Sequence, residues 1–264
     1  MKQGSLYEAL FQIGTLIFVI IIVHATYVTV IRPNAELIQE QQQLMQEQNP
    51  DIVPERSVFI IVRDYEQEFC IIFFFWAVTI IGMKTQHTLR QRALLERTLV
   101  KLQDGMSILP EDSRNYARPV QALGPKEKEF LLPRALLAGL HRFQSTQNIH
   151  AVSSIIKDTC ETEADRMETE LSIVRYIAWA IPSIGFLGTV RGIGTALGQA
   201  YQAVAGDIAG VTQSLGVAFN STFVALVVSI FLMYFLHQLQ LSQDRLVLEL
   251  NDRCNDNLLP KLRL

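Results

Sequence analysis

The sequence has few of the residues that mark an enzyme or a secreted scaffold. Its three cysteines, Cys70, Cys160 and Cys254, lie far apart without a CxxC or Cys/His pattern, which argues against a disulfide framework or a zinc site. A formal net charge of −3 over 264 residues gives no reason to expect nucleic-acid binding. The sequence also lacks a phosphate-binding loop, an HExxH motif and a nucleophile elbow. We therefore predict a non-enzymatic protein with no metal and no cofactor.

Long apolar stretches are what the sequence has instead, with 49% hydrophobic residues and a mean hydropathy of +0.21. A helix needs about 20 apolar residues to cross a bilayer. The first, third and fourth of four apolar runs reach this length, whereas the second, residues 69–83, is short unless the amphipathic residues 57–67 extend it, so full spanning there is left open. The first run has no cleavage-site pattern and is predicted to be a retained span. The four runs are residues 10–31, 69–83, 176–200 and 216–239.

The basic residues predict the orientation of these spans. Residues 84–175 hold 14 of the 23 lysines and arginines, whereas residues 33–68 hold only Arg56 and Arg63. Basic loops stay on the cytoplasmic side, so both termini are predicted to be cytoplasmic. The fold prediction is an all-α integral membrane protein with about four transmembrane helices and long cytoplasmic helical extensions. Its segments are a first transmembrane helix (1–32), an extracytoplasmic loop (33–68), a second transmembrane helix (69–84), a cytoplasmic helical region (85–175), a channel-forming helix pair (176–240) and a cytoplasmic C-terminal helix (241–264).

The last two runs carry stripes of small and hydroxyl-bearing residues. Helices in lipid associate through close backbone approach, which small residues allow. Two such stripes either pack tightly against each other or together line a narrow space, and the sequence alone favours neither. The stripe of the third run is Gly185, Gly188, Gly192, Thr195 and Gln199, and that of the fourth is Ala218, Thr222, Ala225 and Ser229, both at helical spacing.

None of the four runs contains an aspartate or a glutamate. Proton paths through lipid generally use carboxylates or histidine chains, and His24 lies far in sequence from the polar stripes, so we interpret it as structural. If the protein conducts ions, a partner must supply the titratable group. The hydroxyls of Thr189, Ser221 and Thr222 would then hydrogen-bond to that group or to water.

Arg191 is the charged residue of the third run. A charge at the bilayer centre costs about 2.5–3.5 kcal/mol on insertion scales. Reaching the outer interface would relieve this cost, and we favour that interpretation slightly. The alternative is a salt bridge to a carboxylate of a subunit or partner, or to Asp207.

Two segments carry a resemblance to a known family. "IPSIGFLGTVRGIGTAL" and "LGVAFNSTFVALVVSIFLMYF" resemble the last two spans of the MotA/TolQ/ExbB proton channel family. The resemblance covers residues 176–240. The sequence departs from the family pattern at Phe231, where many members have a proline, and at Arg191, where an aromatic or aliphatic residue is common. The matching positions are Pro182, Gly185, Gly188, Thr189, Val190, Gly192, Ile193, Ala218 and Thr222.

The resemblance implies an ion-conducting subunit of a rotary-type motor in the bacterial inner membrane. Family members form a homopentamer around a dimer of a single-span subunit whose membrane aspartate carries the ion. By this resemblance Thr189 and Thr222 face that aspartate, while Pro182 and Gly188 shape the span. We include Asn220 and Ser221 in the predicted ion pathway because they make the start of the last span polar.

The ion and the class of function remain open at this point. A partner carboxylate suits a proton, and sodium is the alternative because hydroxyl oxygens help coordinate it. A non-conducting membrane scaffold, assembled through glycine packing, is the alternative function. If the protein is a scaffold, Thr222→Val should leave its function intact. If it is a channel subunit, the same variant should still assemble but lose activity.

Overall fold

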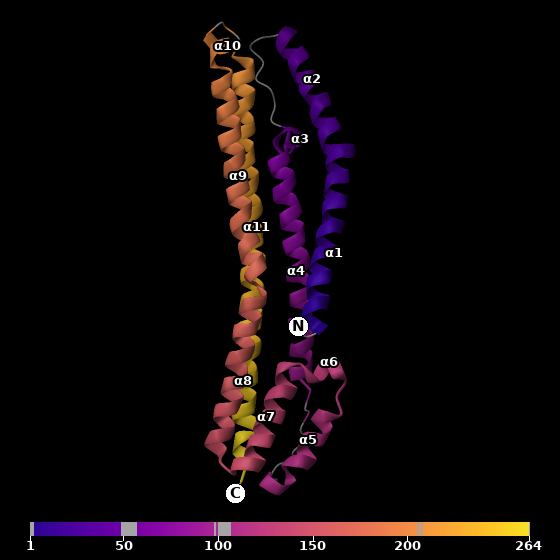
Figure 1. Ribbon diagram of the computed structural model, residues 1–264, viewed down its shortest axis with the longest axis vertical. Coiled ribbons are helices and arrows are strands. Elements are labelled where there is room, and N and C mark those ends of the chain that lie inside the picture. The colour runs from indigo at the N-terminus through magenta and orange to yellow at the C-terminus, as the bar shows by residue number, and fades with distance from the viewer. Residues whose placement is uncertain are drawn as a thin grey trace. The chain divides into compact units, whose positions relative to one another are not determined.

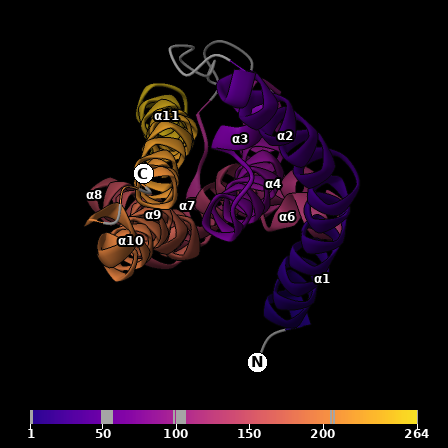
Figure 2. The ribbon, with the colours of Figure 1, turned by 90° about the horizontal axis from the view of Figure 1, so that it is seen from above.

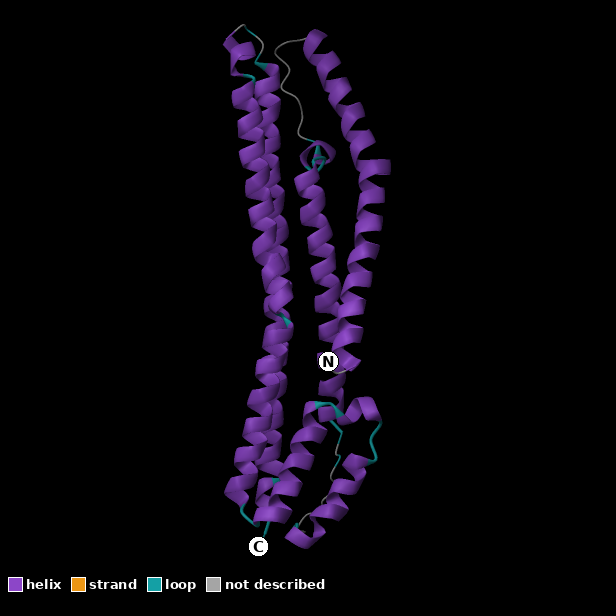
Figure 3. Ribbon diagram, viewed as in Figure 1, coloured by secondary structure: helices purple, strands orange, loops and turns teal. Residues whose placement is uncertain are grey.

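The protein is described here by a computed structural model of residues 3–48, 57–97, 99, 107–204, 206 and 208–263. Over these residues the chain is nearly all helix and contains no strand longer than a single bridge (Figure 3). Four helical stretches, Leu10–Met45, Tyr65–Leu95, Ile149–Gly198 and Ala209–Lys261, are long and apolar enough to cross a membrane. The predicted all-α membrane fold with four spanning helices is confirmed.

The chain divides into two compact units. Unit 1 comprises Met1–Ile81 and Ile173–Leu236, and unit 2 comprises Gly82–Ser172 and His237–Leu264. Helices α4 (Tyr65–Leu95) and α11 (Ala209–Asn257) each contribute residues to both units. Unit 1 therefore holds most of the apolar helical length, and unit 2 holds most of the basic middle segment.

Unit 1 begins with one long helical rod that differs from the prediction. Helix α1 (Gln3–Thr26) runs through a π-helical turn, η1 (Tyr27–Ile31), directly into α2 (Arg32–Gln48) (Figure 1). The apolar run does end at Arg32, but the helix does not, although Pro33 follows. Proline lacks an N–H and its ring crowds the carbonyl four residues earlier. The wider π turn just before Pro33 accommodates both effects, which is why the helix continues.

The second apolar run is part of a longer helix than its own length suggested. A short helix α3 (Val58–Ile61) is followed by α4, which starts before the apolar run and extends beyond it. The Trp76 indole N–H donates to the Gln12 carbonyl at 3.0 Å and joins α4 to α1. Val19, Val23, Tyr27 and Ile72 form a small buried cluster between the same two helices.

The last two apolar runs form an antiparallel pair. Helix α9 (Ser172–Gly198), the short α10 (Ala200–Val204) and α11 fold back on one another, and α9 lies beside α11 in both views (Figures 1 and 2). This pair contains the two small-residue stripes.

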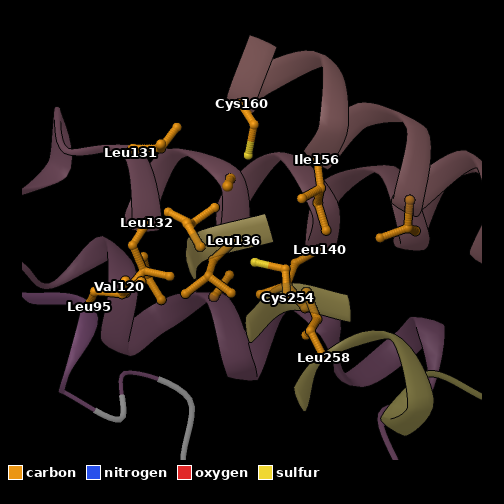
Figure 4. Close-up of a cluster of buried hydrophobic side chains, with 14 of the residues drawn as sticks. Leu95, Val120, Leu131, Leu132, Leu136, Leu140, Ile156, Cys160, Cys254 and Leu258 are labelled. Atoms are coloured by element: carbon orange, nitrogen blue, oxygen red, sulfur yellow. The ribbon is translucent and has the colours of Figure 1, made fainter. Parts of the chain in front are cut away.

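Unit 2 is a helical bundle with a core of large side chains. Its elements are η2 (Pro110–Asp112), α5 (Ser113–Gln121), α6 (Pro125–Lys128), α7 (Leu131–Thr146), α8 (Ile149–Glu170) and η3 (Leu259–Lys261), together with the ends of α4 and α11. The Asn148 side chain caps α8 by accepting from the backbone N–H groups of His150 and Ala151. Leucines surround Cys160 and Cys254 in this core (Figure 4). Burying such side chains from water is what holds the bundle together.

Candidate functional site

The seam between α9 and α11 is built on three glycines that are all buried. A Cβ atom on Gly185 would lie 2.4 Å from the Ala225 Cβ, and one on Gly192 would lie 2.7 Å from the Ala218 Cβ and 2.8 Å from backbone atoms of α11. Gly188 meets Ser221 in the same way, at 2.5 Å. The structure therefore brings the two small-residue stripes face to face, at a separation that any side chain at these glycines would prevent.

Pro182 lies inside α9 and breaks one hydrogen bond of that helix. The proline has no N–H for the carbonyl of Ala178, four residues earlier. The Ser229 hydroxyl of α11 donates to this carbonyl at 3.5 Å. The small-residue stripe of α11 thus also supplies a polar partner for the carbonyl that the proline leaves unpaired, in a place where an unpaired carbonyl is costly.

Thr189 and Thr222 meet across the seam. The Thr189 hydroxyl donates to the Ala218 carbonyl at 3.0 Å, and the Thr222 hydroxyl donates to the Gly185 carbonyl at 3.1 Å. The two hydroxyl oxygens also contact each other. Each threonine is half-buried, so the pair lies at the edge of the seam rather than sealed within it.

Ser221 faces Gly188 in the seam but makes different hydrogen bonds from the threonine pair, and Asn220 lies elsewhere. Ser221 is fully buried, donates to the Val217 carbonyl at 2.9 Å and accepts from the Gln67 amide of α4 at 3.4 Å. Asn220 lines a separate cavity of about 540 Å³ that also includes glutamines of α2 and Asp64. Successive helical residues point about 100° apart, so three in a row cannot serve one path. The structure brings together only Thr189 and Thr222 of the four residues predicted for the ion pathway.

The start of α4 carries three polar residues that sequence reasoning missed. Glu66, Gln67 and Glu68, here called the α4 triad, immediately precede the apolar run that begins at residue 69 and so lie outside that run. Acidic residues in a first helical turn are a common signal, because they favour the positive end of the helix dipole. That signal identifies a helix start, but it does not identify the partners.

Each member of the triad contacts a different helix. Glu66 forms a two-point salt bridge with Arg191 of α9, with N–O distances of 2.7 and 2.8 Å. Gln67 reaches Ser221 of α11. The triad therefore ties α4 to both helices of the seam.

Glu68 makes the third connection. It is buried, and its two oxygens lie 2.7 Å from the His24 Nδ1 atom of α1 and 2.5 Å from an Arg32 nitrogen of α2. His24 therefore contacts a carboxylate of another helix, and its interpretation as a structural residue stays a prediction. A buried carboxylate needs such partners, because desolvation without them is very costly.

Arg191 forms a salt bridge within its own chain. Its partner is Glu66, and Asp207, the alternative considered from the sequence, lies outside the described residues. About half of the Arg191 side chain remains exposed, at 52%. The salt bridge is therefore formed within the chain, and the reach of Arg191 to the outer interface stays a prediction. No group of three or more potential metal ligands occurs among the described residues.

Comparison with known proteins identifies the domain that contains this seam. Residues 127–252 match the family model of the MotA/TolQ/ExbB proton channel family. The matched region begins in α6 and ends in α11, so it includes Thr189 and Thr222. No curated protein and no solved structure matched the chain. The resemblance found in the sequence is confirmed: the chain carries a domain of this family, a channel and transport family, in a multi-pass membrane protein.

Proposed function

We propose that this chain, with its MotA/TolQ/ExbB domain, is the proton-conducting subunit of a rotary-type motor in the bacterial inner membrane. Five copies would surround a dimer of a single-span subunit that carries a membrane aspartate. Ion flow through this complex would drive mechanical work on the cell envelope, with both termini of the chain in the cytoplasm. The observation that carries the proposal is the meeting of Thr189 and Thr222 at the edge of the seam.

The threonine pair has more capacity to accept hydrogen bonds than to donate them. Each hydroxyl has one proton and two lone pairs. The two protons serve four contacts, namely the Ala218 carbonyl, the Gly185 carbonyl from each of the two hydroxyls, and the contact between the hydroxyl oxygens. Two protons cannot fill all four contacts, so an outside donor to the hydroxyl oxygens is favourable. A protonated carboxyl group of a partner is such a donor, which supports a proton as the transported ion.

The position of the pair leaves room for a partner helix. Around α9, Ile181 and Gly188 contact α4 through Cys70 and Glu66. From Gly188, helical geometry places Gly185, which faces α11, about 60° round the helix and Thr189 about 100° round in the same direction. Thr189 therefore lies beyond α11 as seen from α4. This arrangement supports a partner that approaches the seam from the side opposite α4.

The test compares two substitutions of one hydroxyl. Thr222→Val keeps the shape and removes the hydroxyl, whereas Thr222→Ser keeps the hydroxyl. The complex should be purified with its native partner, reconstituted in liposomes and assayed for flux driven by a pH gradient, with and without sodium. We expect the valine variant to assemble but to lose flux about tenfold, because removal of the hydroxyl leaves buried polar groups without a partner, which costs about 1–3 kcal/mol. The serine variant should retain most of the flux.

Three outcomes would overturn parts of this proposal. Normal flux in assembled Thr222→Val would remove the role of the pair and favour the scaffold alternative. Strict dependence on sodium would replace the proton with sodium. A purified complex without an enclosed single-span helix would contradict the proposed single-span partner.

A further inference from the structure

Charge is unevenly distributed among the helices of unit 2. The unit 2 part of α4 (residues 82–95), α5 and α7 carry basic residues and no acidic ones. The other two long elements are acidic: α8 has six carboxylates against two basic residues, and residues 237–257 of α11 have four against two. The basic residues are Lys84, Arg90, Arg92, Arg114, Arg118, Arg134 and Arg142, and the carboxylates are Asp158, Glu161, Glu163, Asp165, Glu168, Glu170, Asp244, Glu249, Asp252 and Asp256.

Ion pairs inside unit 2 use part of this charge. Lys84 binds Glu170 at 2.6 Å, and Arg92 binds Glu249 at 2.7 Å. Charged side chains also remain exposed on both kinds of helix. Arg114 and Arg118 are exposed one turn apart on α5.

Three of the exposed acidic residues border a cavity between α8 and α11. This cavity has a volume of about 360 Å³, and Asp165, Glu168 and Asp244 are among its lining residues. Met167 and Leu171 lie among the same lining residues and are themselves buried. An acidic rim over an apolar floor suits an arginine, whose aliphatic stem covers apolar surface while its charged end pairs with carboxylates.

The basic and acidic surfaces lie on different sides of α7. Helix α7 packs against both α5 and α8, and Figure 1 shows α5 and α8 on opposite sides of it. A molecule with complementary surfaces on two opposite sides binds copies of itself head to tail, and such contacts close into a ring when the rotation allows.

We infer that α5 of one copy, through Arg114 and Arg118, docks on the acidic α8–α11 cavity of the next copy. This inference rests on the proposed function for the existence of a ring of copies, and adds the surface by which neighbouring copies recognise each other. Exposed ion pairs contribute little energy each. Their role here is to select the orientation and register of neighbours whose membrane helices would otherwise slide.

Cross-linking of paired cysteines tests this contact in the full-length complex. Arg118→Cys combined with Asp165→Cys should give covalent multimers up to a closed ring with a short bifunctional thiol reagent, and either substitution alone should not. Arg118→Cys with Glu36→Cys, an exposed α2 position in unit 1, is the matched control and should give none. The native cysteines stay in place because all three are buried.

A charge exchange gives a second measurement that does not depend on cysteine chemistry. Arg114→Glu with Arg118→Glu, or Asp165→Arg with Asp244→Arg, should each reduce the fraction of complete rings seen by native mass spectrometry. Combining all four substitutions should restore that fraction. A complete, flux-competent ring that shows neither the cross-link nor the charge-exchange effect would overturn this inference alone. Loss of the ring in the wild-type protein would instead contradict the proposed function.

Discussion

The seam of unit 1 and the core of unit 2 are held together in opposite ways. In the seam, Gly185, Gly188 and Gly192 bring backbones into contact, and hydroxyls bind carbonyls of the facing helix. In unit 2, buried leucine, isoleucine and phenylalanine side chains fill the space between helices. In lipid, burying apolar side chains provides no driving force for helix association, so the seam depends on close approach and hydrogen bonds. In water, the burial of apolar surface is favourable, so the core of unit 2 depends on buried area.

Truncation of the unit 2 core should have the largest effect on stability. Phe143 is fully buried at 0% exposure, and Phe143→Ala should cost about 3–5 kcal/mol because it removes apolar contacts and leaves a cavity. Leu248→Ala on α11, at an exposed position, is the matched control and should change stability little.

The buried thiols of unit 2 provide the measurement for this variant. Burial raises the pKa of the Cys160 thiol to about 11 and that of Cys254 to about 12, so neither forms the reactive thiolate at neutral pH while unit 2 is folded. Alkylation at pH 7.5 during a thermal ramp should start at a lower temperature in Phe143→Ala than in the wild type. Equal onset temperatures would contradict the dependence of unit 2 on this core.

In the seam, replacing a glycine by a larger residue, rather than truncating a side chain, should reduce stability. Gly192→Ala adds a Cβ atom 2.8 Å from two backbone atoms of α11, which cannot move aside as a flexible side chain can. We expect a loss of about 3 kcal/mol, at the upper end of the usual cost of overpacking. Gly194→Ala in the same helix has no atom within 4 Å and serves as the control. Yield and thermal stability in detergent report both, and equal behaviour of the two variants would contradict the close contact.

The four spans and the small residues of the seam could be predicted from the sequence. The four spans follow from apolar length, and the seam glycines follow from their helical spacing, because both are properties of one segment at a time. The path of the rod past Pro33 was not predicted, since apolar length says where a span ends but not where its helix ends. The contacts of the α4 triad were also missed, because they join segments that lie 36 to 154 residues apart in the sequence.

The separation of Asn220, Ser221 and Thr222 could have been predicted. Three consecutive residues in a helix point in three directions, so they cannot all face the same neighbour. The sequence does not reveal which direction each one takes, because that depends on where α4 and α9 pack around α11. Only the structure shows that the Ser221 hydroxyl accepts from Gln67 of α4 and that the Thr222 hydroxyl donates to the Gly185 carbonyl of α9.

A charged contact in unit 2 tests how much a polar contact contributes beside that apolar core. Lys84 is buried against Glu170, and Lys84→Met should cost about 1–3 kcal/mol by leaving the carboxylate with fewer partners. The cost should fall near the lower end because Arg166 still binds Glu170 at 2.9 Å. Lys84→Arg, which keeps the charge, is the control in the same thermal assay.

The same pair gives unit 2 a defined pH dependence. Burial acts to raise the pKa of Glu170, but the hydrogen bond and charge of Lys84, with Arg166, lower it below its ordinary value of 4.5. A lowered folded-state pKa contributes stability above the unfolded pKa, and that contribution is lost as pH falls through the folded value. The stability difference between the wild type and Lys84→Met should therefore be constant near neutral pH and shrink below about pH 4.5. A difference that grows on acidification would contradict this assignment.

The hydrogen bond beside Pro182 should have the smallest effect and most directly probes the polar contacts of the seam. Ser229→Ala removes the donor to the Ala178 carbonyl and should cost about 0.6 kcal/mol, the average for such bonds between membrane helices. In a Pro182→Ala background the backbone gains an N–H that can reach the same carbonyl, so Ser229→Ala should then cost less. A double-mutant cycle measures this coupling directly. Equal costs in both backgrounds would mean that Ser229 does not compensate for the proline, and that glycine contacts alone hold this end of the seam.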